Sequence, residues 1–307
     1  MSQSTQAPQQ DAPTPKQGND FNPRTGKRHW TARFFKVLTF IATIIGMIVL
    51  AVLLFDIGLE GIPRLSPDFI TSGGTSSPET TGIYTGLVGS LWLVALTALF
   101  AVPLGIGAAV YLEEYAKDSW LNRIVEINIS NLAGVPSIVY GLLALGIFVN
   151  YLGFLTGGTS ILSGAAALSL LILPVIIIAS REAVRAVPGK VREGAYALGA
   201  TKWDTVRGHV LPMALPGAMT GTILALSRAI GETAPLIVVG ASAYLSFTPN
   251  GPRDRFSAMP IQIFEWTALP QEGWEAVAAA GIVVLLVVLL LMNSIAITIR
   301  NRTQRGG

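Results

Sequence analysis

Long apolar runs with few charges alternate with polar segments along the whole chain. Six of these runs are long enough, at about 1.5 Å of helical rise per residue, to cross a hydrocarbon core of about 30 Å. They cover residues 34–55, 87–112, 127–151, 161–180, 212 to about 244, and 276–299. The pattern predicts an all-α, polytopic integral membrane protein with six transmembrane helices.

The polar segments predict the domain organisation. Residues 1–30 are rich in Gln, Pro, Ser and Thr and contain too little apolar surface to fold, so we expect a disordered cytoplasmic tail there. The first transmembrane helix is expected at 31–57, an extracytoplasmic loop at 58–84, a core of five further helices at 85–300, and a second cytoplasmic tail at 301–307. The apolar run at 34–55 exceeds the roughly 7 to 15 residues of a signal-peptide core, so it is expected to stay as an anchor.

Three local patterns qualify this scheme. Pro174 predicts a break in the fourth run, because proline removes a backbone donor. Between the fifth and sixth runs, aromatic residues such as Phe256 and Trp266 alternate with polar ones, which favours a segment lying in the membrane interface. The third run contains Asn131 and Ser137, which are costly in lipid unless they face the bundle or a water path. For either residue a helix–helix contact is the simpler explanation, and a place on a substrate path is the alternative.

Composition and charge support a membrane protein and set its orientation. Hydrophobic residues make up 51% of the 307 residues and charged residues only 13%, well below the globular norm of roughly a quarter. Cysteine is absent, which excludes disulfides and thiolate metal sites. With both termini in the cytoplasm, 17 of the 21 Lys and Arg residues lie on the cytoplasmic side and three outside, while Arg228 lies within a span.

The segment 187–212 predicts a short helical hairpin that leads directly into the fifth apolar run. Pro188 suits a first helical turn, and Gly199 suits the position after a helix end, where φ becomes positive. Thr201 and Asp204 have the spacing of a capping box, so a second helix is expected at once. Gly194 keeps the surface shallow, which favours a docking knob for another protein, although a plain linker explains the spacing equally well. A DNA-reading helix-turn-helix is rejected because its second helix would already be entering the bilayer.

Charge within the fifth run marks a second candidate site. Arg228 lies roughly midway along that run, and Glu232 is four residues on, so the two share one helix face. An arginine near the bilayer centre costs on the order of 3 kcal/mol unless it is paired or faces water. A structural ion pair is one interpretation. The other is a substrate path, because the planar guanidinium matches the oxygens of phosphate.

Other function classes fit the sequence less well. The histidines, His29 and His209, lie outside the central parts of the apolar runs, which leaves an intramembrane hydrolase without a base. The adjacent Glu113 and Glu114 lack a neighbouring histidine for a metal-assisted peptidase. A passive anion channel is harder to exclude, and the hairpin is the feature that speaks against it.

Several segments resemble a known family of transporters. Glu193-Gly194-Ala195, then Gly199 and Leu211-Pro212, resemble the EAA loop of bacterial ABC-importer permeases, with Gly194 in place of the usual alanine and His209 in place of the usual isoleucine. The segments 134–141, 228–236 and 259–264 are similar to those of the phosphate-specific (Pst) permeases, of the PstA type rather than the PstC type.

The resemblance implies the type I ABC importer permease fold, with residues 85–300 as the permease core, in the inner (plasma) membrane of a bacterium. It implies a PstC-type sister permease, a PstB-type ATPase dimer that holds ATP and Mg, and a phosphate-binding protein, with no cofactor in this chain and no nucleic-acid partner. A permease for another oxyanion such as sulfate stays an alternative. The implied substrate path comprises Arg228, Glu232, Thr233, Ser137 and Asn131, and the implied contact with the ATPase comprises Glu193, Gly194, Ala195, Gly199, Ala200 and Thr201. The sequence contains no G-x-x-x-x-G-K-[ST] phosphate loop, which agrees with ATP hydrolysis on a separate subunit.

Overall fold

The computed structural model describes residues 25–242, 244–245 and 247–305 of the chain. Two compact units, Met1–Leu54 and Phe55–Gly307, are distinguished by their internal contacts, and each is described by itself. Most of the predicted tail 1–30 lies outside the described residues, as do residues 306 and 307. Residues 25–30 are helical, so the expectation of disorder up to residue 30 is wrong for that part.

The described elements are all helical. Helix α1 (Thr25–Gly61) begins in the first unit and ends in the second. The other elements are η1 (Ile62–Arg64), α2 (Pro67–Thr71), α3 (Tyr84–Val110), η2 (Tyr111–Tyr115), α4 (Trp120–Leu132), α5 (Ser137–Ala144), η3 (Leu145–Tyr151), α6 (Gly153–Thr156), α7 (Ile161–Arg185), α8 (Gly189–Ala197), α9 (Lys202–Thr205), η4 (Val206–Val210), α10 (Leu211–Ile230), α11 (Ala234–Val239), α12 (Met259–Ala268) and α13 (Trp274–Arg305). Of the η elements, η1 is a 3-10 turn, and η2, η3 and η4 are π-helical.

The part of α1 in the first unit exposes apolar side chains all round. Phe40 and Val49, which lie on opposite faces of the helix, are both exposed, and none of the apolar window in the candidate span Ala32–Arg64 is buried. A helix that is apolar on every side is stable only in an apolar surrounding. This exposure therefore fits a segment surrounded by lipid.

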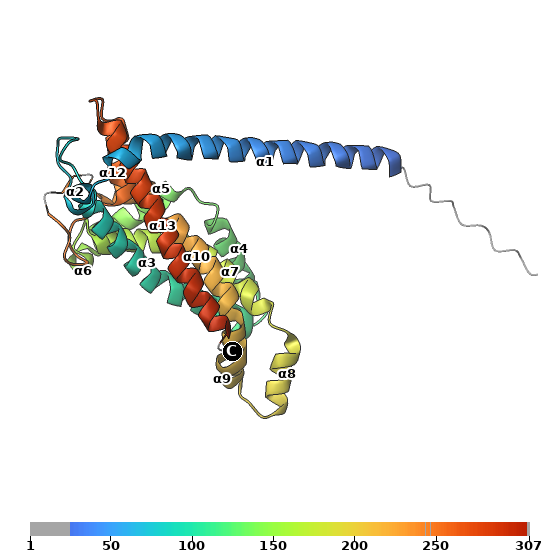
Figure 1. The fold of residues 1–307 in the computed structure, drawn as a ribbon. Helices are drawn as coiled ribbons and strands as arrows, with labels where there is room; N and C mark the ends of the chain where they lie inside the picture. Colours follow the sequence, from blue (N-terminus) through green and yellow to red (C-terminus); the bar gives the residue numbers. More distant parts are fainter. Residues whose placement is uncertain (1–24, 243, 246, 306–307) are drawn as a thin grey trace, which may run out of the picture. The chain divides into compact units, whose positions relative to one another are not determined.

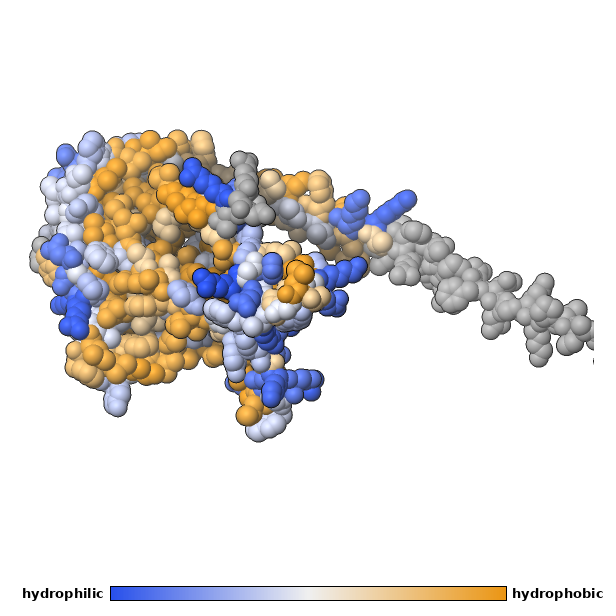
Figure 2. Space-filling model, turned by 90° about the horizontal axis from the view of Figure 1, so that it is seen from below, coloured by the Kyte–Doolittle hydropathy of each residue, from blue (hydrophilic) through white to orange (hydrophobic). Residues whose placement is uncertain are grey.

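The second unit is a bundle in which α7 packs along α3 and α10, and α13 packs against α10 and α12 (Figure 1). Small residues such as Ala101 and Ala225 lie at these contacts among larger apolar residues such as Ile172. Small side chains let helix backbones approach closely, which is how helices associate in lipid. Figure 2 shows a largely hydrophobic surface on this bundle, with hydrophilic residues gathered towards its ends. Five described helices are long and apolar enough to cross a membrane, or six elements if one bent helix pair is counted as a span.

That bent pair corrects the predicted third span. The apolar run 127–151 was expected to form one helix, but α4 and the helix that starts at Ser137 meet at an angle of 108°. The break falls at residues 133–136, where Pro136 precedes α5. Because proline has no backbone N–H and disfavours helical geometry in the residue before it, a straight helix cannot continue there.

The fourth and fifth spans also differ from expectation. Helix α7 continues through Pro174, so the predicted break is wrong; packing of α3 and α10 against α7 holds the helix together at that point. The fifth run, expected to be one helix to about residue 244, instead ends at Ile230, and α11 begins after residues 231–233. Pro235 lies in the first turn of α11, which favours a helix start over a helix interior.

The segment after α11 is buried rather than interfacial. Trp266 on α12 and Trp274 at the start of α13 are fully buried, and their rings stack with centroids 6.4 Å apart. Phe69 of α2 joins them at 6.2 Å from Trp266. Trp266 and Trp274 therefore form a core with α13, and the prediction that they anchor a membrane-interface segment is wrong. Phe264 of α12 differs, because it is exposed.

Candidate functional site

The hairpin α8–α9 projects from one end of the second unit (Figure 1). Gly199 has φ = 81°, a left-handed conformation that other residues adopt only with strain. Thr201 caps α9 and forms the predicted capping box with Asp204. Pro188 is the residue that caps α8, one position before its first turn. The two helix ends and the turn between them therefore have the geometry expected from the sequence.

Most of the residues expected to contact an ATPase are exposed on this hairpin. Glu193, Gly194, Gly199 and Thr201 are exposed, Ala200 is half-buried, and Leu198 beside the tip is 90% exposed. A Cβ atom added at Gly194 or Gly199 would meet nothing within 4 Å, so the tip is shallow and open. Ala195 differs, because it is buried and its carbonyl accepts from Ala200 N inside the turn. Its part in the hairpin is internal packing.

A buried ion pair fastens the hairpin to the end of α3. Arg192 of α8 donates from Nε at 2.9 Å and from Nη2 at 2.7 Å to the same carboxylate oxygen of Glu114 in η2. The side chains of Glu114 and Arg192 are only 6% and 22% exposed. Arg192 also donates to the carbonyl oxygens of Val184 and Val187. The hairpin is thus tied both to α3 and to the end of α7.

A second ion cluster lies beside this joint. Arg181 of α7 pairs with Glu113 and with Glu126, each at 2.7 Å, and Arg185 pairs with Glu113 at 2.8 Å. Together with Asn131, Arg181 and Arg185 line a recess of about 380 Å³ between α4 and α7. Sequence reasoning missed both ion clusters. The only signal was the placement of charged residues at the ends of apolar runs.

Arg228 occupies the last turn of α10, directly before the break in the fifth span, and not the middle of a continuous helix. Its Nε lies 3.1 Å from Oε1 of Glu232, so the expected pair forms across the helix end. The arginine side chain is 57% exposed and the glutamate 18%. Within the described part of the chain, Nη1 and Nη2 of Arg228 have no protein partner. The guanidinium can therefore offer two terminal nitrogens to a ligand.

The other predicted path residues are only partly gathered around Arg228. Thr233 lies in the break and caps α11, with its carbonyl accepting from Leu236 N and Ile237 N. Ser137 begins α5, which packs closely on α11. Asn131, by contrast, lines the recess with Arg181. Arg228, Ser137 and Asn131 therefore lie on three different helices, whereas Glu232 and Thr233 lie in the break between α10 and α11. Of these five residues, the structure pairs only Arg228 with Glu232.

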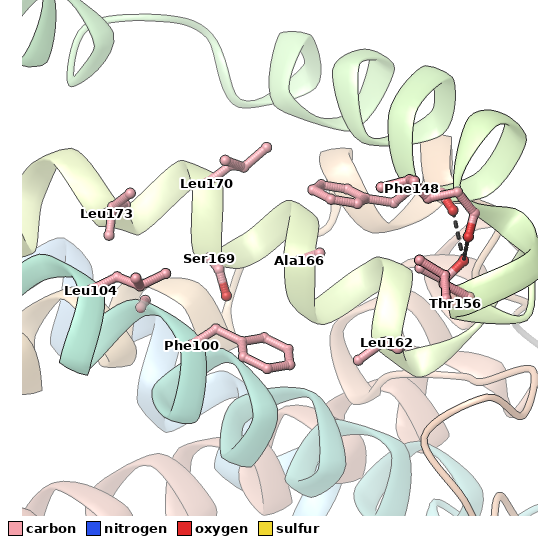
Figure 3. A pocket seen from close by; sticks show the side chains of 12 residues that line it. Phe100, Leu104, Phe148, Thr156, Leu162, Ala166, Ser169, Leu170 and Leu173 are labelled. Carbon is pink, nitrogen blue, oxygen red and sulfur yellow. Dashed lines mark hydrogen bonds between the residues drawn. The ribbon is translucent and has the colours of Figure 1, made fainter.

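The recess in Figure 3 does not suit an anion. It has a volume of about 350 Å³ and lies among α3, α7 and η3, lined by apolar side chains such as Phe100, Leu104 and Phe148. The hydroxyl of Thr156, at its edge, donates to the carbonyl of Phe148 and is already used. An anion there would lose hydration without gaining a charged or hydrogen-bonding partner. The partly exposed guanidinium at the broken span remains the better candidate.

A bundle of membrane-spanning helices with a capped hairpin at one end and an available arginine at a broken span defines a membrane permease component. The chain belongs to the family of binding-protein-dependent transport system inner membrane components, whose family model matches residues 101–304. Its fold is similar to a bacterial alginate ABC transporter solved with an alginate-bound periplasmic protein. That match has a TM-score of 0.64 and 16% identity over 88% of this chain and 93% of that one.

Known relatives place the chain among the PstA-type members of this family. It is 32% identical to the phosphate transport system permease protein PstA of Haemophilus influenzae over 257 residues, which is 83% of this chain and 89% of the relative. It is 36% identical to the corresponding protein PstA 1 of Mycobacterium tuberculosis over 220 residues, which is 71% of this chain and 70% of the relative.

Proposed function

We propose that this chain is the permease subunit of an ATP-driven phosphate importer and that Arg228 lies on its translocation path. The similarity to PstA proteins supports phosphate as the substrate. The single observation that supports this site is the partial exposure of the Arg228 guanidinium at the end of α10, with both terminal nitrogens available for a ligand. Arginine binds phosphate oxygens through such paired donors.

Glu232 gives this site a moderate affinity. Its carboxylate holds Nε of Arg228 and offsets part of the positive charge. A transported ion must bind well enough to enter and weakly enough to leave, so a fully unpaired arginine would hold phosphate too tightly. The two terminal nitrogens of Arg228 contact the anion, while Glu232 limits the affinity with which the anion is bound.

The hairpin α8–α9 is the proposed contact with a separate ATPase. Its exposed tip at Gly199 and its shallow face at Gly194 suit insertion into a groove of a partner. The ATPase subunits would be a PstB-type dimer that holds ATP and Mg, with no cofactor on this chain. A PstC-type sister permease and a phosphate-binding protein complete the proposed assembly.

The proposed orientation places both termini and the hairpin in the cytoplasm of a bacterium, with the chain in the plasma (inner) membrane. The basic residues support this arrangement, because Lys190, Lys202 and Arg207 lie on the hairpin segment and Arg300 and Arg302 lie at the C-terminal end of the last candidate span. Lys and Arg are concentrated on the cytoplasmic side of membrane proteins. ATP is then available on the side where the hairpin projects.

The test is uptake of labelled phosphate by the complete transporter in vesicles, driven by ATP. Arg228→Gln keeps hydrogen bonding but removes the charge, and we expect it to abolish uptake while assembly with the ATPase is retained. Arg228→Lys should retain part of the uptake, since the charge survives without the planar fork. Arg300→Gln, near the C-terminal end of α13, is the matched control and should transport normally, because Arg300 contacts Thr220 about two turns of α10 away from Arg228.

Near-normal uptake by Arg228→Gln would overturn the role of this residue and favour a structural ion pair. Phosphate flux through the complex without ATP would overturn active import and favour a passive anion channel. Uptake of sulfate in preference to phosphate would instead assign the permease to another oxyanion.

A further inference from the structure

A groove lies on the outside of the second unit, where α3 meets the base of the hairpin. It has a volume of about 490 Å³, and its floor is formed by Ile106, Gly107 and Val110 of α3 facing Val206 and Leu211. A Cβ atom added at Gly107 would meet nothing within 4 Å, which shows that the space above this glycine is open. Among the described residues, no side chain fills this apolar depression.

One end of the groove is aromatic and basic. Tyr111 and Tyr115 of η2 and Trp203 of α9 line it, and all three are exposed. Arg207 lines the same end, and Nζ of Lys202 lies 5.3 Å from the centre of the Tyr115 ring. The groove thus passes from purely apolar residues on α3 to aromatic and cationic residues at the hairpin.

This order of residues matches the depth profile of a lipid leaflet. Both walls are the ends of candidate membrane spans, Tyr84–Tyr115 and Lys202–Ile230. Tyrosine and tryptophan concentrate at the level of lipid headgroups, and basic side chains there attract anionic lipids. The apolar floor would then lie at acyl-chain depth and the two cations at the depth of the lipid phosphate.

The cations are available for such a headgroup. Asp204 is the nearest acid in the sequence, but its carboxylate accepts hydrogen bonds from the amide and hydroxyl of Thr201 in the capping box. Among the described residues, neither Lys202 nor Arg207 forms an ion pair within the chain. Arg207 attracts the Asp204 carboxylate at longer range, but no acid occupies the hydrogen-bonding groups of either cation among the described residues. A negative ligand at this end can therefore pair directly with both.

We infer that this groove is a binding site for one anionic phospholipid, with an acyl chain against Gly107 and the headgroup phosphate at Arg207 and Lys202. The charge at the hairpin end favours this occupant over an apolar face of a second protein, which would leave both cations without a partner. Because the site lies where η2 and η4 join the hairpin, a bound lipid would brace the base of the hairpin. The inference does not depend on which ion the permease carries.

The experiment uses the complete transporter in phosphatidylcholine vesicles that contain phosphatidylglycerol, with bromine placed on the acyl chains of one lipid at a time. Trp203 reports contact, and its signal is the difference in fluorescence quenching between the wild type and Trp203→Phe. At equal mole fraction we expect brominated phosphatidylglycerol to quench Trp203 with an apparent affinity about fivefold higher than brominated phosphatidylcholine. A factor of this size corresponds to about 1 kcal/mol, the value of one basic residue near an anionic surface.

Two variants separate the two ends of the site. Arg207→Gln should remove most of the preference for phosphatidylglycerol while leaving some quenching by both lipids. Gly107→Leu should fill the groove and reduce quenching by both lipids. Gly146→Leu, on η3 and equally open to an added side chain, is the matched control and should behave like the wild type.

Equal quenching by the two lipids in the wild type would overturn the anionic site. Quenching of Trp203 in the isolated permease that disappears in the complete transporter would show that a partner chain covers the groove, which also overturns the proposal. Failure of Gly107→Leu to assemble with its partners would also overturn the proposal, because the open space at Gly107 would then be part of a protein–protein interface.

Discussion

The joint between Arg192 and Glu114 should decide how firmly the hairpin is held to the rest of the permease. Glu114→Ala removes the acceptor of two hydrogen bonds, at 2.9 and 2.7 Å, from a side chain that is only 6% exposed. Breaking a buried ion pair by removing one partner costs about 3 to 5 kcal/mol, because the remaining charge is left without compensation. Arg192 keeps two carbonyl acceptors and is 22% exposed, which lowers the expected cost to about 2 kcal/mol.

Amide hydrogen exchange of α8 measures this cost directly, because it reports local opening. A loss of about 2 kcal/mol corresponds to an approximately thirtyfold fall in protection of the α8 amides, while the amides of α13 should be unchanged. Glu182→Ala is the matched control, since it breaks the Arg185–Glu182 pair, whose side chains are 57% and 67% exposed. Exposed pairs contribute about 0 to 1 kcal/mol, so its effect on exchange should be several-fold at most.

The functional consequence follows from the same contact. If the hairpin transmits motion of the ATPase to α3 through this joint, Glu114→Ala should hydrolyse more ATP per phosphate transported than the wild type. Equal protection of α8 in Glu114→Ala and Glu182→Ala would refute the mechanical role of the buried pair. Normal coupling despite a loosened α8 would show that α10 alone carries the motion.

Three further substitutions test other parts of the molecule. Gly199→Val forces a β-branched residue into φ = 81°, so it should weaken pull-down of the ATPase subunit and its stimulation by substrate; normal values for both would exclude docking at the tip. Glu232→Gln should raise sulfate transport relative to phosphate, because sulfate cannot donate a hydrogen bond and is repelled by a carboxylate; an unchanged ratio in competition assays would count against this role. Gly141→Val would place its Cβ 2.7 Å from the Cα of Pro235 and should lower the thermal stability of the complex, whereas Gly146→Val in open space should leave the melting temperature unchanged.

Patterns formed by residues close together in the sequence predicted several of the helices and the turn of the hairpin correctly. The apolar run at 276–299, which contains no charged residue, lies within α13. Gly199 has the positive φ expected after a helix end, and Thr201 forms the expected capping box. These features depend on residues a few positions apart, so the sequence contains the necessary information. The helical-membrane fold was predicted correctly for the same reason, and the permease family was predicted correctly from the resemblance of the hairpin and three further segments to known permeases.

Features that depend on distant residues were not predicted. The Arg192–Glu114 joint connects positions 78 apart, and neither residue has a local pattern that reveals its partner. The aromatic residues around Trp266 were assigned to the membrane interface, because a buried core and an interfacial belt have similar composition. The bend at Pro136 could have been found, since the proline was visible, but apolarity alone favoured a continuous helix.

The π-helical segment η4 has a geometric consequence for the hairpin. Each residue of an α-helix turns the chain by about 100°, so the wider turn of a π-helix changes the direction in which everything beyond it points. Val206–Val210 lies between α9 and α10. It therefore determines how far α8 and α9 are rotated about the axis of α10. Removing one residue from this segment would preserve the surface of the hairpin and the length of α10 almost unchanged, yet it would aim that surface towards a different side of the assembly. The direction in which the hairpin points is therefore determined by five residues that lie between it and the membrane helix.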